Sequence, residues 1–238
     1  MRQEKVGGLT VRMTGGIDGR GGGNGPVVVL LHGFGAPGDD LVVLGEYLDA
    51  PAGTRFLFPE APLSMPVGYG NARAWWMIDM ARIQADRAAG RIRDLSSEVP
   101  VGLVQVRERV VSLLDELHHK VGADPKKAIL GGFSQGAMLA CDAVLRSDRP
   151  YAGLIQLSGT LLAKQEWGPL LLKRRSLPVF QSHGTQDPIL PYVMAERLRD
   201  EFVRAGLKVE WLPFRGGHEI PEPVLRKLGQ FIQSHLGR

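Results

Sequence analysis

The sequence predicts an α/β fold in which a mostly parallel central sheet carries helices on both faces. Short β-branched and aliphatic runs alternate with segments of helical periodicity, and the run at residues 27–31 is apolar on both faces. Such a strand is typical of the centre of a parallel sheet, and strands alternating with helices indicate β-α-β units. No linker divides the 238 residues, so we expect residues 1–238 to form one domain.

The pattern before residue 101 predicts the start of the sheet and then a departure from it. The expected elements are strands at 9–13, 27–31 and 55–58 and a helix over 39–48. Residues 1–26 are expected to hold an edge strand, at 9–13, and a Gly-rich loop. Residues 61–100 combine prolines, glycines, two tryptophans and several arginines. They predict an excursion from the sheet with some local helix.

After residue 100, strands and helices alternate regularly. The expected elements are helices at 101–119, 137–145, 194–205 and 221–236, and strands at 128–131, 154–157, 179–181 and 209–212. The carboxyl ends of parallel strands meet at one edge of a sheet, where ligands bind in open α/β folds. We therefore look for functional residues in the loops that follow the strands.

Composition narrows the function classes. The single cysteine, Cys141, excludes an intramolecular disulfide and a thiolate zinc cluster. The chain has 29 basic and 25 acidic residues, and the basic residues are spread along the sequence rather than clustered, which does not predict a nucleic-acid-binding surface. No segment has the roughly 20 consecutive apolar residues of a membrane span, and the N-terminus does not resemble a secretory signal. We expect a cytoplasmic protein, a monomer or a homodimer, that binds neither nucleic acid nor a metal ion.

The most informative motif is G-x-S-x-G at residues 132–136, which reads Gly-Phe-Ser-Gln-Gly. It follows the strand expected at 128–131 and opens an apolar helix. This strand–turn–helix setting is typical of a nucleophile elbow, in which a sharp turn exposes the serine and the glycines leave room for strand and helix to pack. Ser134 is therefore the predicted nucleophile, and a purely structural serine turn is the alternative.

A serine hydroxyl needs a base to take its proton, and in enzymes with this elbow the acid and the histidine follow the serine in that order. Asp187 lies in the loop after one expected strand, and His218 lies in the loop after the last one. The other candidates do not follow a strand in the required order. They are Asp142, Asp148 and Asp200 among the acids and His118, His119, His183 and His235 among the bases. Of these, His183 is interpreted as a packing or loop-ordering residue, and Cys141 as core.

The negative oxygen that forms during acyl transfer needs two preorganised donors. One is expected to be the backbone N–H of Gln135, which follows the nucleophile. The other is expected from the glycine-rich loop at residues 32–35, directly after the first central strand, where the N–H of Phe34 is the candidate.

Several segments resemble the phospholipase/carboxylesterase family of α/β-hydrolases, which includes acyl-protein thioesterases and small bacterial serine esterases. They are Leu-His-Gly-Phe-Gly at 31–35, Phe-Pro-Glu-Ala-Pro at 58–62, Gly-Phe-Ser-Gln-Gly at 132–136, His-Gly-Thr-Gln-Asp-Pro at 183–188 and Gly-His-Glu-Ile at 217–220. The similarity extends from about residue 27 to the C-terminus. It implies a single α/β-hydrolase domain with Ser134 as nucleophile, His218 as base and Asp187 as its orienting acid.

The segment near the acyl site departs from the family pattern. Trp75 and Trp76 resemble the family's Trp-aromatic pair, but two residues separate them from Asp79. The arginine-rich stretch at 82–93 matches no family segment. Trp75, Trp76 and Met77 are predicted to line an acyl pocket, with ordinary packing of the excursion as the alternative.

These observations predict a cofactor-free serine carboxylesterase that hydrolyses short- to medium-chain carboxylic esters or thioesters through an acyl-enzyme. Its kcat/KM is expected to fall below pH 6–7, roughly where histidine side chains become protonated. The alternatives are a lysophospholipase, acyl-protein thioesterase, lactonase or peptidase with the same residues, or a non-catalytic binding module on a hydrolase scaffold.

Overall fold

The computed structural model describes residues 1–65 and 70–237. The strands of the main sheet are β1 (Arg2–Val6), β2 (Leu9–Gly16), β3 (Arg20–Gly22), β4 (Val27–Leu31), β5 (Arg55–Pro59), β8 (Ala128–Phe133), β9 (Gly153–Leu157), β10 (Pro178–Gly184) and β11 (Lys208–Phe214). They are ordered β1-β2-β5-β4-β8-β9-β10-β11, with β3 beside β2. The strands from β5 to β11 in this order pair in parallel, and β2 is antiparallel to both β1 and β5. The predicted mostly parallel sheet is confirmed.

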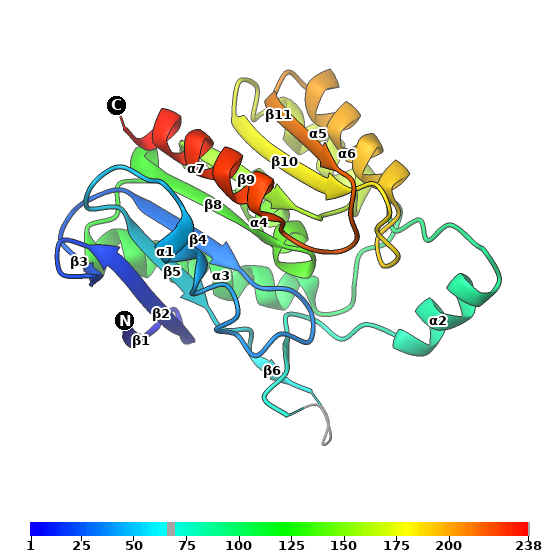
Figure 1. Cartoon of the computed structure of the whole chain (residues 1–238), viewed down its shortest axis with the longest axis horizontal. Helices are drawn as coiled ribbons and strands as arrows, with labels where there is room; N and C mark the ends of the chain where they lie inside the picture. The colour runs from blue at the N-terminus through cyan, green and yellow to red at the C-terminus, as the bar shows by residue number, and fades with distance from the viewer. Residues whose placement is uncertain (66–69, 238) are drawn as a thin grey trace.

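Helices pack on both faces of this sheet (Figure 1). They are α1 (Leu44–Tyr47), α2 (Met80–Ala88), α3 (Leu103–Val121), α4 (Gln135–Arg146), α5 (Lys164–Leu172), α6 (Tyr192–Arg204) and α7 (Glu222–Leu236), with a short 3₁₀ helix at Pro125–Lys127. All of β4 is buried. Its Val28 and Leu30 belong to the core under α1 and α7, whereas Val29 and Leu31 belong to the core under α3 to α6. Successive side chains of a strand point to opposite faces, so an unbroken apolar run supplies both cores.

The prediction that residues 9–13 form the edge of the sheet is wrong. The strand β1 pairs outside β2, with Arg2 opposite Met13. Of the five β1 residues, only Val6 is buried, so the segment lacks the apolar alternation that predicts a strand. The helix expected at 39–48 is reduced to the four residues of α1. The helix α5 was not predicted; it buries Trp167 and Leu171 and contains Pro169.

The excursion predicted at 61–100 leaves the sheet after β5. It contains a two-stranded hairpin of β6 (Leu63–Ser64) and β7 (Arg73–Ala74), followed by α2; residues 66–69 lie outside the described part. Figure 1 shows α2 standing apart from the sheet, beyond the carboxyl ends of the strands. The segment therefore covers the edge at which the predicted site lies.

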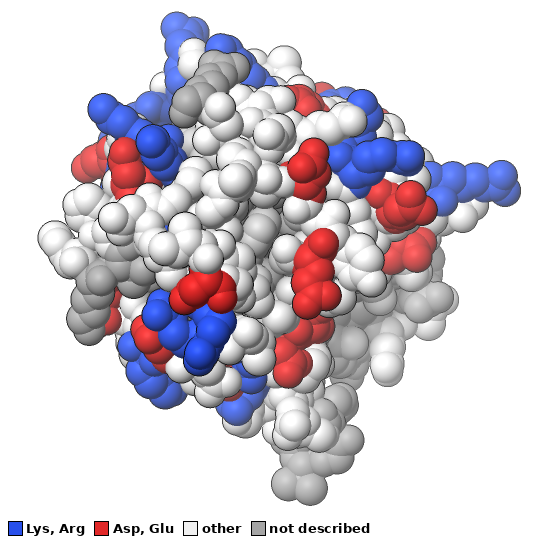
Figure 2. Space-filling model, turned by 60° about the vertical axis from the view of Figure 1, so that its left-hand side comes forward, with Lys and Arg blue, Asp and Glu red and all other residues white. Residues whose placement is uncertain are grey.

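The surface carries charges of both signs. Lys and Arg are interspersed with Asp and Glu on the face shown in Figure 2, around a broad uncharged area. None of the described helices is both long and apolar enough to span a bilayer.

Candidate active site

Ser134 occupies the sharp turn between β8 and α4. Its φ of 54° and ψ of −117° lie outside the helical and extended regions, a conformation that costs free energy in a residue other than glycine. The Ser134 N–H donates to Leu157 O of the neighbouring β9 at 2.8 Å, which fixes the turn against the sheet. The serine is 8% exposed and sits at the N-terminus of a helix, where negative charge is stabilised.

The two glycines of the motif are required by close packing. A Cβ atom built on Gly132 or on Gly136 would overlap the backbone of Leu31 at the end of β4. The elbow and its helix can therefore approach the central strand only because both positions lack a side chain. This explains the G-x-S-x-G spacing by sterics rather than by chemistry.

Asp187 and His218 lie in the loops that follow β10 and β11, and they are hydrogen-bonded to each other. The His218 Nδ1–H donates to Asp187 Oδ2 at 2.6 Å. The Asp187 side chain is fully buried, and its Oδ1 accepts from the N–H groups of Ile189 and Leu190 at 2.8 and 2.9 Å. Burial raises the pKa of Asp187, but the hydrogen bonds from His183 and His218 outweigh it and hold that pKa well below the ordinary value.

Two backbone hydrogen bonds join these two loops, and a third closes the turn before Asp187. Thr185 N–H donates to Phe214 O at 2.8 Å, and Gln186 N–H donates to Gly216 O at 2.9 Å, while Asp187 N–H closes its own turn on Gly184 O at 3.2 Å. The distance from Asp187 to His218 is thus fixed by the parallel pairing of β10 with β11.

His183, which the sequence left outside the site, contacts Asp187 directly. Its Nε2 lies 3.2 Å from Asp187 Oδ2 and 2.9 Å from Leu190 O. Both neighbours are acceptors, so Nε2 carries a hydrogen and donates to them. The Asp187 carboxylate therefore receives two histidine donors on one oxygen and two backbone donors on the other. The sequence did contain a feature that could have indicated this contact: His183 is the last residue with a side chain in the strand before the loop that carries Asp187.

Ser134 and His218 line the same cavity, and the Phe133 ring lies 4.8 Å from the His218 ring, centroid to centroid. With Nδ1 bonded to Asp187, Nε2 is the His218 nitrogen that remains for Ser134. No hydrogen bond between Ser134 and His218 is present among the described residues. In enzymes without substrate this bond is often long and tightens on binding.

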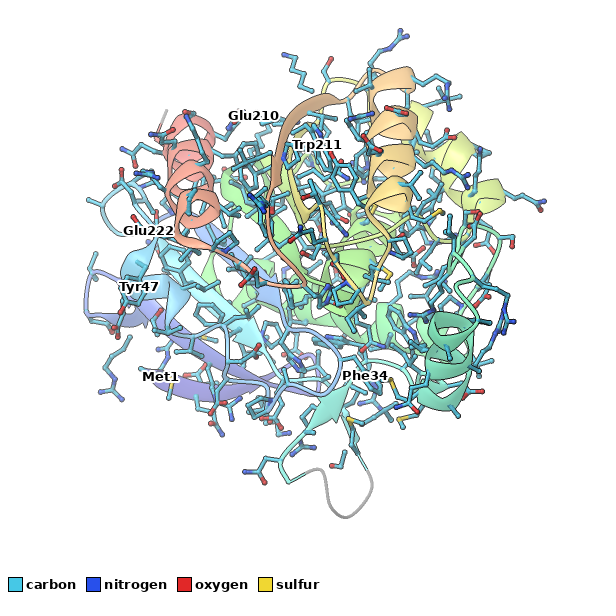
Figure 3. The ribbon with its side chains drawn as sticks, turned by 45° about the vertical axis from the view of Figure 1, so that its right-hand side comes forward. Met1, Phe34, Tyr47, Glu210, Trp211 and Glu222 are labelled. Atoms are coloured by element: carbon cyan, nitrogen blue, oxygen red, sulfur yellow. The ribbon has the colours of Figure 1, made fainter. Side chains whose placement is uncertain are left out.

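The loop that carries Phe34 passes beside the elbow. A Cβ atom on Gly33 would lie 3.5 Å from Ser134 Cβ, and Figure 3 shows Phe34 between the sheet edge and α2. The loop is held by Gly35 N–H, which donates to Arg73 O at 2.8 Å. Neither Phe34 N–H nor Gln135 N–H is a donor in the backbone hydrogen bonds of the described segments.

The Gln135 side chain ties the excursion to the elbow. Its Oε1 accepts from Trp75 N–H at 2.9 Å, and its Nε2 donates to Trp76 O at 2.8 Å. The Trp75 indole N–H donates to His32 O at 2.9 Å. His32 in turn accepts from Ala61 N–H at 3.0 Å through Nε2. One glutamine thus positions the Trp-Trp segment through its amide, a role that the motif does not reveal.

A cavity of about 710 Å³ opens in front of Ser134 and His218, within the usual size of small-molecule sites. Trp76 and Met77 line it, as does the Phe34 side chain, whereas Trp75 is not among the lining residues. Its ring is 1% exposed and lies 5.3 Å from the His32 ring, centroid to centroid. Further apolar side chains of the lining come from several elements: Ile83, Ile92, Leu95, Met138, Leu162 and Ile189.

Two other groups that the sequence raised lie apart from this cavity. Cys141 is fully buried in α4, and burial raises its thiol pKa well above the ordinary value, so it packs as core. Asp142 is also buried and accepts from Trp167 Nε1 at 2.8 Å and Arg107 Nη1 at 3.0 Å. Within residues 1–65 and 70–237, no group of three or more His, Cys, Asp or Glu side chains is arranged to hold a metal ion.

The sequence matches one family and a set of curated relatives. A model of the family described as phospholipase/carboxylesterase matches residues 21–236. The acyl-protein thioesterase 1 of Kluyveromyces lactis is 33% identical over 179 residues, covering 69% of this chain and 71% of that protein. The acyl-protein thioesterase 1 of Saccharomyces cerevisiae is 27% identical over 229 residues, covering 88% and 92%.

Solved structures share the same fold. The crystal structure of esterase PE8 superposes with a TM-score of 0.79 at 28% identity, covering 96% of this chain and 99% of that one. The carboxylesterase of Bacillus cereus superposes with a TM-score of 0.69 at 18% identity, covering 95% and 94%; this second likeness is one of fold.

Proposed function

The chain belongs to the phospholipase/carboxylesterase family and is a serine ester hydrolase, and on this premise we propose that Ser134, His218 and Asp187 carry the reaction. One observation carries the proposal. The hydrogen bond between His218 and Asp187 lies just beyond the carboxyl ends of the paired strands β10 and β11, and His218 lines the same cavity as the strained Ser134. That is the arrangement an activated serine requires: a base near the nucleophile and an acid that orients the base.

In the proposed mechanism, His218 Nε2 accepts the Ser134 hydroxyl proton as Oγ bonds to the carbonyl carbon of the substrate. The Phe34 and Gln135 N–H groups donate to the carbonyl oxygen as it becomes negative. The tetrahedral intermediate collapses, the alcohol or thiol leaves with the proton from His218, and an acyl-Ser134 remains. Water then gives a proton to His218 and its oxygen to the acyl carbon, and Ser134 takes the proton back. Asp187 stays ionised throughout and stabilises the imidazolium.

The proposed substrates are short- to medium-chain carboxylic esters or thioesters, with Trp76 and Met77 against the acyl chain. The apolar lining of the cavity and the names of the yeast relatives support this class. Trp75 would act from behind the cavity, by holding Trp76 through Gln135 and His32. Lysophospholipids, acyl-proteins and lactones present the same carbonyl chemistry and remain alternatives within the family.

A p-nitrophenyl ester series from acetate to octanoate, run beside matched thioesters, tests the substrate class. Turnover of at least one series, together with labelling of Ser134 by a fluorophosphonate probe, is the expected result. Folded protein that neither turns over these compounds nor takes the label would contradict the proposal and favour a non-catalytic binding module.

The proposal also includes a cytoplasmic location, no nucleic-acid partner, and a monomer or homodimer. The mixed surface charge and the buried Cys141 are consistent with it. Light scattering after size exclusion tests the assembly, and a mass above that of two chains would contradict it.

A further inference from the structure

The excursion supplies both apolar and charged residues to the cavity lining, and the Asp, Glu and Arg residues of the described lining all come from it. Among the side chains that the structure describes in the segment 79–98, those of Arg82, Arg91 and Arg93 line the cavity together with Ser134 and His218. In the sequence, the arginine-rich part of this segment, residues 82–93, is matched to no family segment, and the proposed mechanism does not use its charges. The role of these arginines therefore depends on which charged groups each of them contacts.

Two of the three arginines are neutralised by carboxylates of the same segment. Arg82 pairs with Glu98 at 3.2 Å, and Arg91 pairs with Asp86 at 2.7 Å. The remaining acids of the lining are also engaged. Asp94 binds Arg197 of α6 at 3.0 Å, and Asp79 accepts from the N–H of Arg82 at the start of α2, at 2.9 Å.

Arg93 is different. Among the described residues, no carboxylate lies within 4 Å of its guanidinium and no hydrogen bond satisfies it, although it is partly buried in the cavity wall. Burial lowers the pKa of Arg93, and the carboxylates of Glu98 and Asp86 act in the opposite direction from beyond contact distance. A cation that is withdrawn from water is stabilised when an anion or a set of hydrogen-bond acceptors pairs with it. Here the cavity itself is the space in which such an anion would sit.

We propose that Arg93 is the binding site for a second, anionic group of the substrate, a carboxylate or a phosphate, carried on the acyl or the alcohol part while Ser134 acts on the ester. A planar guanidinium binds either group through two parallel N–H donors. The inference rests on the proposed function of this cavity and narrows it to esters that are amphiphilic: apolar along the chain and anionic at a point away from the scissile bond.

Matched ester pairs test the inference. The first pair is p-nitrophenyl hexanoate and the mono-p-nitrophenyl ester of adipic acid, which differ in a terminal carboxylate. The second pair is butyl hexanoate and 4-phosphobutyl hexanoate, which places a phosphate on the alcohol part. The measured quantity is the ratio of kcat/KM for the anionic ester to that for its neutral partner.

In Arg93→Gln this ratio is expected to fall roughly 10-fold for at least one pair, mainly through KM, because a charge-assisted hydrogen-bonded contact is lost. Arg93→Lys is expected to restore part of it. The matched control is Arg226→Gln, which removes a positive charge from the exposed face of α7, away from the cavity, and leaves the ratio unchanged. Loss in the first pair assigns a carboxylate on the acyl part, and loss in the second assigns a phosphate on the alcohol part.

An unchanged ratio for both pairs in Arg93→Gln overturns the inference while hydrolysis of the neutral esters leaves the proposed function standing. A fall of the same size in Arg226→Gln also overturns it, since the effect is then one of net charge. Absence of turnover on every ester by the unmodified protein is a failure of the proposed function instead. As an independent readout, adipate is expected to inhibit p-nitrophenyl acetate hydrolysis more strongly than hexanoate, and Arg93→Gln is expected to abolish that difference.

Discussion

The loops at the sheet edge and the segment 79–98 line the same cavity, but their functional side chains are buried and held to different degrees. Ser134 and Asp187 are 8% and 9% exposed, and backbone hydrogen bonds fix each of them to a neighbouring strand or turn. In the segment 79–98, Ile92 is 67% exposed. The arginine side chains of its pairs Arg82–Glu98 and Arg91–Asp86 are 67% and 61% exposed. Exposed pairs contribute little to stability.

This difference distinguishes the residues proposed to carry out the reaction from those proposed to select the substrate. Groups that must keep a fixed mutual geometry are placed on strand ends, where the sheet sets their distances. Groups expected to select the substrate lie on the excursion. The end of its segment 79–98 is joined to the start of α5 by Ala163 N–H, which donates to Glu98 O at 3.1 Å, and by Lys164 N–H, which donates to Ser96 O at 2.7 Å. The paired cavity-lining arginines of that segment are held through their side chains. Substitutions at the sheet edge are therefore expected to reduce the chemical step, and substitutions in the excursion to change which ester is accepted.

Replacing Ser134 by Ala is the largest expected effect. It removes the proposed nucleophile but keeps the Cβ atom, so the backbone conformation is unchanged. We expect kcat to fall by about 10,000-fold or more while the fold is kept. Steady-state kinetics on p-nitrophenyl acetate measure the loss, and circular dichroism checks the fold. A reduction of only a few-fold would contradict the assignment of Ser134.

Asp187→Asn is expected to reduce kcat by about 10,000-fold as well, because an amide no longer holds His218 with Nδ1–H toward the acid. It should also change acid stability. In the folded chain the pKa of Asp187 is held below its ordinary value, so the unfolded chain binds the additional proton between that lowered value and about 4.

The contribution of Asp187 to stability is therefore present above about pH 4 and is lost as the pH falls below it. Urea unfolding between pH 5 and 3 is expected to show a smaller loss of unfolding free energy in Asp187→Asn than in the unmodified chain. An equal loss in both would show that Asp187 gains no stability from its partners.

His183→Phe is expected to lower kcat/KM by about 10-fold, since Asp187 loses one of two donors on the oxygen that also holds His218. His183→Gln keeps an N–H donor and is expected to recover most of the activity. Comparing the two variants on p-nitrophenyl butyrate separates positioning from packing. Equal activity of the Phe and Gln variants would assign His183 to packing alone.

Met77→Ala tests the other side of the comparison. The side chain lines the cavity but is 51% exposed, so unfolding free energy should change by less than about 0.5 kcal/mol. The ratio of kcat/KM for octanoate to that for acetate is expected to fall by roughly 3-fold, because apolar contact with the longer chain is lost. A uniform loss on all chain lengths would instead place Met77 in the chemical step.

Arg82→Gln is the smallest expected effect. Its pair with Glu98 is exposed, with the arginine side chain 67% accessible. Thermal unfolding is expected to show a change below about 0.5 kcal/mol. A loss several times larger would show that the segment 79–98 is tied to the core more firmly than its contacts indicate.

The sequence by itself determined the α/β fold, the elbow and the family. These follow from local physics. An apolar run that supplies both cores, as β4 does, and a serine between two close-packed glycines leave signatures within a few residues. Asp187 and His218 were also predicted, because chain order and the ends of parallel strands limit the candidates to one acid and one base.

The tertiary structure alone decided what depends on contacts between distant segments. The β1 strand has too few apolar residues to be predicted, and it forms because β2 offers an edge to pair with. Three features of the site depend on distances between side chains that only the fold sets. His183 and His218 both donate to Asp187, the Gln135 amide hydrogen-bonds to the Trp-Trp segment, and Trp75 does not line the cavity. The same holds for Arg93. In the sequence it is one arginine of several, and only the pairing of its neighbours in space leaves it facing the cavity without a carboxylate among the described residues.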